Sequence, residues 1–210
     1  MREIIGDFCH DQLVANMKQA LAFDEKRDYN QWKAEVKEKL NELLGMREIA
    51  KNACPLNMEI ESEEQKDGYK QIRFTFESEK DCFVPCYLLI PDTGKEKYPV
   101  AIVLQGHYKG GVYGSLGEIR DEKDKSYQPR GAFAVQAVHN GYIALAIEQR
   151  AMGERQSKRH PFDPMGCTHA TMAAFELGRT TIGERVWDAQ RAIDVLSEFP
   201  QADTEKIVVT

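Results

Sequence analysis

Apolar residues recur at helical spacing in two stretches near the start of the chain. Asp28 can cap the second stretch at its N-terminus, and Gly45 can end it. The pattern predicts a helical extension over residues 1–50, whose role the sequence leaves open. The apolar positions are Leu13, Met17, Ala20 and Leu21 in the first stretch, and Trp32, Val36, Leu40, Leu43 and Leu44 in the second.

After residue 56 the period changes to the alternation of apolar and polar residues that is typical of half-buried strands. Residues 58–60 and 72–76 alternate in this way, and Asp67-Gly68 between them predicts a turn. Residues 82–90 form a third apolar run. Pro85 within it has no N–H to donate, so we expect an edge strand or a bulge there rather than a central strand.

The rest of the chain alternates strands with helices, which indicates a parallel sheet covered on both faces. Residues 100–104 and 142–147 predict strands, and residues 131–139 predict a helix between them. Residues 181–199 predict a second helix, and residues 206–210 a buried final strand.

The helix over 181–199 has the clearest pattern. Thr181 and Glu184 form a potential capping box, and Pro200 is expected to stop the helix. The apolar positions recur every three or four residues and predict its buried face: Ile182, Val186, Ala189, Ile193 and Leu196.

Composition narrows the class of protein. Apolar residues make up 42% of the 210 residues, and the net charge is −6 without a basic run, which argues against a nucleic-acid partner. No stretch predicts a membrane span or a secretory signal. Five cysteines are an odd number at irregular spacing, so we expect free thiols and a cytoplasmic location.

Candidate chemistry lies directly after the strand over 100–104. The segment Gln105-Gly106-His107-Tyr108-Lys109-Gly110-Gly111 is rich in glycine. Ligands bind beyond the carboxyl ends of strands in open α/β sheets. Glycine lets a backbone N–H approach a developing oxyanion closely. A plain glycine-rich turn is the alternative.

Three segments carry a resemblance to a known family. Residues 104–111 resemble the oxyanion loop of α/β-hydrolases, residues 148–154 resemble the D-Q-R-G-x-G segment, and residues 184–194 resemble the helix before the nucleophile strand. Together they are similar to the acetyl-xylan-esterase and dienelactone-hydrolase-like branch. The resemblance, which spans about residues 70–210, implies an α/β fold. It implies a mostly parallel sheet with antiparallel first strands, incomplete at the C-terminus, as the N-terminal part of a hydrolase domain over 51–210.

The resemblance also implies roles for individual residues. It places one oxyanion donor at the backbone N–H of His107, with Tyr108 beside it in the oxyanion loop, and it places Gly106 and Gln105 among the substrate-binding residues. Gln105 stands where the family has histidine, and its amide is expected to buttress the loop. Arg150 is expected either to contact substrate or to brace its loop, with Glu148 pairing with Arg150 or another arginine, Arg155.

The implied activity is that of a serine hydrolase acting on a carboxylic ester, such as an acetyl group on a carbohydrate or another small molecule. Serine, acid and histidine follow in that order in the superfamily, so all three are expected beyond Thr210 and residues 1–210 alone are expected to be inactive. No cofactor or metal is implied. The alternatives are a non-catalytic scaffold or interaction module and a prolyl-oligopeptidase-like peptidase. Expected partners are a small ester, and either a second copy or a complementary C-terminal segment.

Two other clusters offer weaker alternatives to this assignment. Ser157, His160 and Asp163 lie close in sequence, but a short loop rarely presents a catalytic triad usefully. Cys167 and His169 could begin a metal site, but no second ligand pair follows at zinc spacing.

Overall fold

The computed structural model describes residues 6–107, 110–119, 131–157 and 166–210. Contacts divide the chain into two units, Met1–Glu42 and Leu43–Thr210. The first unit holds α1 (Gly6–Asn16) and most of α2 (Tyr29–Leu44). No helix in the described ranges has the length and apolar character that a membrane span requires.

The first helical stretch is shorter than predicted. The helix α1 ends at Asn16, so Met17 and Leu21 lie beyond it, and none of its residues is buried. A helix this short gains little stability without packing, which explains why the apolar pattern does not extend it. The second predicted helix is present as α2, and Asp28 caps its N-terminus as predicted. The Oδ1 of Asp28 accepts a hydrogen bond from the N–H of Gln31 at 2.8 Å.

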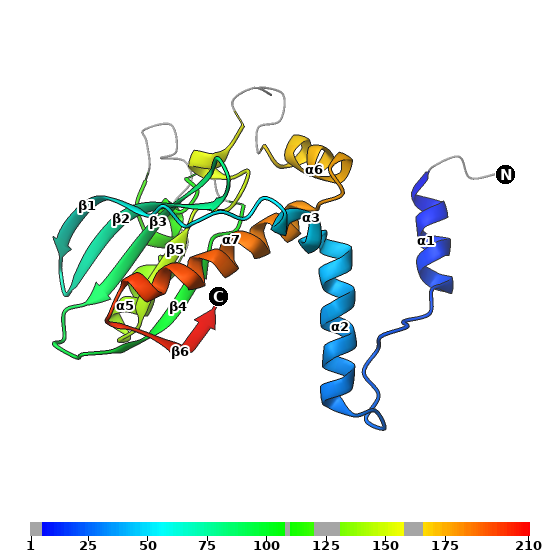
Figure 1. The fold of residues 1–210 in the computed structure, drawn as a ribbon, viewed down its shortest axis with the longest axis horizontal. Coiled ribbons are helices and arrows are strands. Elements are labelled where there is room, and N and C mark those ends of the chain that lie inside the picture. Colours follow the sequence, from blue (N-terminus) through cyan, green and yellow to red (C-terminus); the bar gives the residue numbers. More distant parts are fainter. Residues whose placement is uncertain (1–5, 108–109, 120–130, 158–165) are drawn as a thin grey trace. The chain divides into compact units, whose positions relative to one another are not determined.

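A mixed sheet of six strands forms the centre of the second unit, in the order β1-β2-β3-β5-β4-β6 (Figure 1). The first four strands in this order pair antiparallel, whereas β4 pairs parallel with β5 and with β6. The predicted fold class, an α/β-hydrolase-type sheet with antiparallel first strands, is confirmed. The strands are β1 (Glu59–Lys66), β2 (Tyr69–Glu79), β3 (Cys82–Pro91), β4 (Tyr98–Leu104), β5 (Ile143–Ile147) and β6 (Ala202–Val209).

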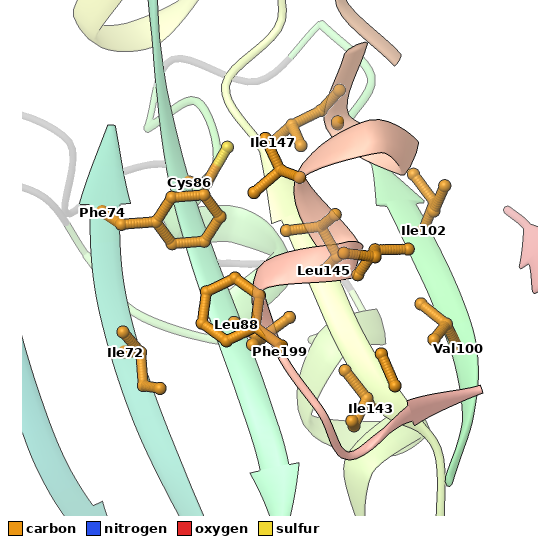
Figure 2. Close-up of a cluster of buried hydrophobic side chains, with 14 of the residues drawn as sticks. Ile72, Phe74, Cys86, Leu88, Val100, Ile102, Ile143, Leu145, Ile147 and Phe199 are labelled. Carbon is orange, nitrogen blue, oxygen red and sulfur yellow. The ribbon is translucent and has the colours of Figure 1, made fainter. Parts of the chain in front are cut away.

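Helices cover both faces of this sheet, as the alternation of elements predicts. On one face, α7 (Thr181–Val195) and Phe199 pack on apolar side chains of the strands, among them Phe74 and Leu145 (Figure 2). On the other face, α5 (Phe133–His139) and α4 (Tyr113–Leu116) pack on a second apolar cluster. The remaining helices are α3 (Met46–Ala50) and α6 (Cys167–Glu176), and 3-10 turns follow at Gly153–Arg155 and Leu196–Glu198.

The prediction that Pro85 marks an edge strand or a bulge is wrong. The strand β3 lies between β2 and β5, and Pro85 falls at the end of its pairing with β5. Its carbonyl accepts the N–H of Glu148 at 2.9 Å. The reciprocal bond would need an N–H on Pro85. Arg155 fills that role, because its Nη1 donates to the Glu148 carbonyl at 3.0 Å.

The predicted final strand forms as part of β6, but within residues 1–210 it is not buried. Among the described residues, β6 pairs with β4 alone and lies at the edge of the sheet. Val208 is 43% exposed and Val209 is 59% exposed. An edge strand has a neighbour on one side only, so its apolar residues are not enclosed.

The helix α7 begins and packs differently from its sequence pattern. Its N-cap is Thr180, whose Oγ1 accepts the N–H of Gly183 at 2.9 Å, while Thr181 bonds Thr171 instead. Ile182 and Ile193 are exposed, contrary to prediction. The buried face lies one position away and includes the carboxylates of Glu184 and Asp188. Its buried residues are Thr181, Gly183, Glu184, Asp188, Ala192 and Val195.

Candidate functional site

The loop after β4 lies at the carboxyl end of the parallel strands, beside the end of β6. The N–H of Leu104 donates to the Thr210 carbonyl at 3.1 Å, and the N–H of Thr210 donates to the Ile102 carbonyl at 3.0 Å. The chain leaves the sheet at Gln105, which is buried, and His107 is exposed. This edge is where open α/β sheets bind ligands.

Gln105 supports this loop in the way that the sequence predicts. Its Nε2 donates to the Glu148 Oε1 at 2.5 Å, and its carbonyl accepts a hydrogen bond from the side chain of Gln149. Glu148 and Gln149 directly follow β5. The loop after β4 is therefore fixed to the segment after the neighbouring strand.

Glu148 is fully buried and holds further backbone in place. Its Oε2 accepts the N–H of Val112 at 3.2 Å and that of Glu154 at 3.3 Å. Burial raises the pKa of Glu148 to about 7, although these two N–H groups favour the ionised form and oppose the shift. One carboxylate therefore joins the start of α4 to the loop that follows β5.

Glycines let the backbone approach this carboxylate. Gly111 (φ 62°) and Gly153 (φ 48°) have left-handed conformations, and a Cβ on either would collide with the Glu148 carboxyl group. Ala151, where the family resemblance expects glycine, is also left-handed with φ 66°. The alanine therefore keeps the backbone shape that a glycine would favour.

Arg150 braces the same loop rather than projecting freely. Its Nη2 donates to the Oδ1 of Asp188 on α7 at 2.6 Å, and its Nη1 lies 2.9 Å from the Oε1 of Glu79. Arg155 donates to the Oδ2 of Asp188 at 2.7 Å. These contacts fit the bracing interpretation. The expected pairing of Glu148 with an arginine is wrong, because Asp188 is the carboxylate that both arginines bind.

Asp188 is 1% exposed and is the centre of this ion cluster. Burial by itself would raise the pKa of Asp188. The charges of Arg155 and Arg150 outweigh that effect and hold the pKa below its ordinary value. The hydroxyl of Ser78 on β2 also donates to Oδ1 at 2.6 Å. The cluster thus joins α7, β2 and the segment after β5.

A second brace acts through Glu154. Arg73 on β2 donates to both carboxylate oxygens of Glu154, at 2.9 and 2.8 Å. It also donates to the Tyr87 hydroxyl at 2.6 Å, and that hydroxyl donates to Tyr113 on α4 at 3.0 Å. The 111–113 and 153–154 segments are therefore both tied to the antiparallel strands.

The remaining candidates divide between described and undescribed residues. His107 Nε2 lies 2.9 Å from the Sγ of Cys167 at the start of α6. Tyr108, His160 and Asp163 lie outside the described residues. Within the described ranges, no group of three or more His, Cys, Asp or Glu side chains could hold a metal ion. All five cysteines are free.

A sequence profile of the Abhydrolase family matches residues 4–210. The chain belongs to this family. The Abhydrolase assignment confirms the resemblance that residues 104–111, 148–154 and 184–194 carry. A comparison with curated proteins finds no match.

Solved structures confirm the fold of this Abhydrolase chain. A Bacteroides fragilis protein provisionally assigned as an acetyl xylan esterase is 21% identical with a TM-score of 0.76, covering 99% of this chain and 54% of its own. A methylesterase is 16% identical with a TM-score of 0.62, covering 97% and 40%. A glucuronoyl esterase from Solibacter usitatus is 15% identical with a TM-score of 0.54, covering 87% and 53%. The chain thus spans about half the length of these proteins.

Sequence reasoning finds the loop but misses how two residues, Glu148 and Asp188, position it. Nothing in the local pattern marks Glu148 as the acceptor for Val112, since the two lie far apart in sequence. Asp188 is missed because the periodicity of its helix predicts a purely apolar buried face. One signal could have identified Asp188: a carboxylate on the buried side of the helix, together with two arginines, Arg150 and Arg155, that follow a strand.

Proposed function

We propose that the protein hydrolyses carboxylic esters by acyl transfer to a serine, with the backbone N–H of His107 as one oxyanion donor. The observation that carries this proposal is the position of the 105–107 loop beside the end of β6. In α/β-hydrolases the oxyanion hole combines an N–H from such a loop with the N–H after the nucleophile. The nucleophile elbow follows a parallel strand next to that loop, and β6 has this position.

The state of the His107 N–H supports the assignment. Among the residues that the structure describes, no acceptor takes this N–H. His107 itself is exposed. Gln105, which precedes it by two residues, is fixed by Glu148 at 2.5 Å. A backbone N–H that is held in place and can bond a ligand is what electrostatic stabilisation of an oxyanion requires.

The proposed mechanism needs no cofactor. The serine, activated by histidine, attacks the ester carbonyl, and the carbonyl oxygen takes up negative charge. The His107 N–H and the N–H after the serine stabilise that charge. By the family order of elements, serine, acid and histidine fall after Thr210, and residues 1–210 alone are expected to lack turnover.

The proposed substrate class is a small acetyl ester, including an acetyl group on a carbohydrate. The names of the similar solved structures, an acetyl xylan esterase and a glucuronoyl esterase among them, support a carbohydrate ester. The fold they share with this chain does not select one ester by itself, so the substrate is tested separately from the mechanism.

Two substitutions at one position test the donor. His107→Pro removes the backbone N–H, whereas His107→Ala keeps it and removes only the imidazole. In the full-length protein, the proline variant should lower kcat for nitrophenyl acetate about 10²–10³-fold, as the loss of one oxyanion donor does. The alanine variant should fall far less. Equal losses in two variants with the same unfolding midpoint as the unmodified protein would contradict the role of the N–H.

A serine-directed phosphonate tests the nucleophile. It should label one serine of the full-length protein in proportion to the lost activity, at a residue after Thr210. Labelling elsewhere, or hydrolysis that resists the phosphonate, would exclude the serine mechanism. Acetylated and deacetylated xylan oligosaccharides, compared with nitrophenyl acetate, would then test the substrate class.

A further inference from the structure

A thiol and an imidazole lie together at the start of α6. The Sγ of Cys167 is 2.9 Å from the Nε2 of His107, although the two residues are far apart in sequence. His107 is exposed and Cys167 is partly exposed. A nucleophile within hydrogen-bond reach of a base is the basic requirement for an activated nucleophile.

A fixed cation completes the cluster. The Nη2 of Arg185 donates to the Cys167 Sγ at 3.4 Å. The Nε and Nη2 of Arg185 also donate to the Arg150 carbonyl, at 3.1 and 2.8 Å, which holds the guanidinium in place. Cys167 is the first residue of α6, where the helix dipole favours negative charge. The cluster therefore brings a nucleophilic sulfur within hydrogen-bond reach of an imidazole and of a guanidinium.

The other described cysteines lack this combination. Burial raises the pKa of the Cys86 thiol well above its ordinary value, and burial followed by the charge of Glu77 raises that of Cys54. Cys82 accepts a hydrogen bond from Arg155 at 3.2 Å, but no imidazole is bonded to it within the described ranges. Cys9 is exposed on α1 and gives a reference thiol in the same molecule.

We propose that Cys167 is a modification site that forms a mixed disulfide with anionic, low-molecular-weight disulfides. His107 accepts the thiol proton, and the thiolate attacks one sulfur of the disulfide. The Cys167 S–S bond forms as the S–S bond of the reagent breaks, and the released thiolate takes the proton from the imidazolium. One thiol and one disulfide give one disulfide and one thiol, so no further oxidant is needed. Arg185 favours an anionic reagent. The inference does not depend on ester hydrolysis.

The test measures site-resolved rates in the full-length protein. The probe is the dianionic disulfide dithiobis(nitrobenzoate) at pH 6, and mass spectrometry of peptides follows each cysteine. Cys167 should react about tenfold or more faster than Cys9, because the bonded His107 can accept the thiol proton as the sulfur attacks. His107→Gln should slow Cys167 about tenfold and leave Cys9 unchanged. A thiol reductant should restore the starting mass.

A second probe separates activation from simple exposure. Neutral dithiodipyridine should show a smaller ratio of Cys167 to Cys9 rates than the dianionic probe, since Arg185 attracts negative charge. Cys167→Ser should remove the fast phase with both reagents, which keeps the test valid if His107→Gln does not fold. A Cys167 rate equal to that of Cys9, or one unaffected in a folded His107→Gln variant, would overturn the proposal.

Discussion

Glu148 connects three backbone segments through one buried carboxyl group. Its oxygens accept hydrogen bonds from the Gln105 side chain and from the N–H groups of Val112 and Glu154. All three donors are neutral, so burial dominates and raises the pKa to about 7. The Gln105 Oε1 has no partner among the described residues. Rotation of that amide would present this oxygen to Glu148 when the carboxyl group is protonated.

The first prediction concerns stability against pH. The folded-state pKa of Glu148, about 7, lies above its ordinary value of 4.5. Between these two pH values the folded protein therefore holds this proton more tightly than the unfolded chain does. The contribution of Glu148 to the free energy of unfolding is therefore fully present below pH 4.5 and falls as the pH rises to about 7. The loss amounts to about 3 kcal/mol.

Glu148→Gln should remove this dependence, because an amide does not ionise. Urea unfolding at several pH values between 4.5 and 8 would measure the free energy of unfolding of both proteins. The difference between them should shift by about 3 kcal/mol across the window, in favour of the variant at high pH. Glu59→Gln, the same change at an exposed position of β1, is the control. Parallel curves for Glu148→Gln and the unmodified protein would contradict the assignment.

The second prediction separates backbone strain from crowding at two glycines. A Cβ on Gly94 (φ 73°) would meet no atom within 4 Å, whereas a Cβ on Gly111 (φ 62°) would lie 2.7 Å from the Gly153 Cα. Gly94→Ala should therefore lower the free energy of unfolding by about 1–2 kcal/mol, through the strain of a left-handed alanine alone. Gly111→Ala should lose about 1–3 kcal/mol more, through overpacking against Glu148. Urea unfolding measures both, and equal losses would show that the approach to Glu148 is not tight.

At the scale of secondary-structure elements, α7 is anchored to the sheet by charge as well as by apolar contact. Asp188→Asn should lower the free energy of unfolding by about 3–5 kcal/mol, because Arg155 would lose its carboxylate partner and Arg150 would lose one of its partners while both charges stay buried. Asp194→Asn on the same helix breaks only the ion pair between Asp194 and Arg191. The Asp194 side chain is 54% exposed. That control should change stability by less than about 0.5 kcal/mol. Similar losses in both variants would mean that the cluster does not anchor the helix.

The direction of the Asp188 contribution with pH follows from its neighbours. Its pKa in the folded protein lies below the ordinary value of 3.8, so its stabilisation is present above that pH and is lost as the pH falls through the folded-state pKa. This is opposite in sign to the effect of Glu148. The free energies of unfolding of the unmodified protein and of Asp188→Asn should therefore converge as the pH is lowered.

The elements themselves are predictable from local pattern, and their environments are not. Periodicity locates α7, but it assigns Ile182 to the buried face, since no local rule reveals that Asp188 meets two arginines from another segment. Pro85 predicts an edge strand because it lacks an N–H. That prediction fails because Arg155 supplies the missing hydrogen bond, and Arg155 is distant in sequence. The loop at Gln105 is predictable because glycine content and position after a strand are local signals. Its support by Glu148 depends on strand order, which sequence alone does not supply.

At the scale of the whole sheet, the two edges differ in how they are protected. The strand β1 presents charged residues along its length, with the sequence Glu-Ile-Glu-Ser-Glu-Glu-Gln-Lys. Charged side chains discourage an edge from pairing with another chain. The strand β6 carries charges in its first half but ends in Val208 and Val209, which are 43% and 59% exposed. Within residues 1–210, the end of β6 is therefore the less protected edge.

The last prediction is that residues 1–210 self-associate, or bind a complementary strand, through the end of β6. Val209→Lys should shift the mass measured by sedimentation toward the monomer across a concentration series, because a charge on an edge opposes pairing. Ile60→Lys on β1, where the replaced residue is 46% exposed, makes the same change at the protected edge and should leave the distribution unaltered. If the unmodified chain stays monomeric over the whole series, β6 does not act as a docking edge. If both variants reduce association equally, the effect comes from net charge and not from the edge.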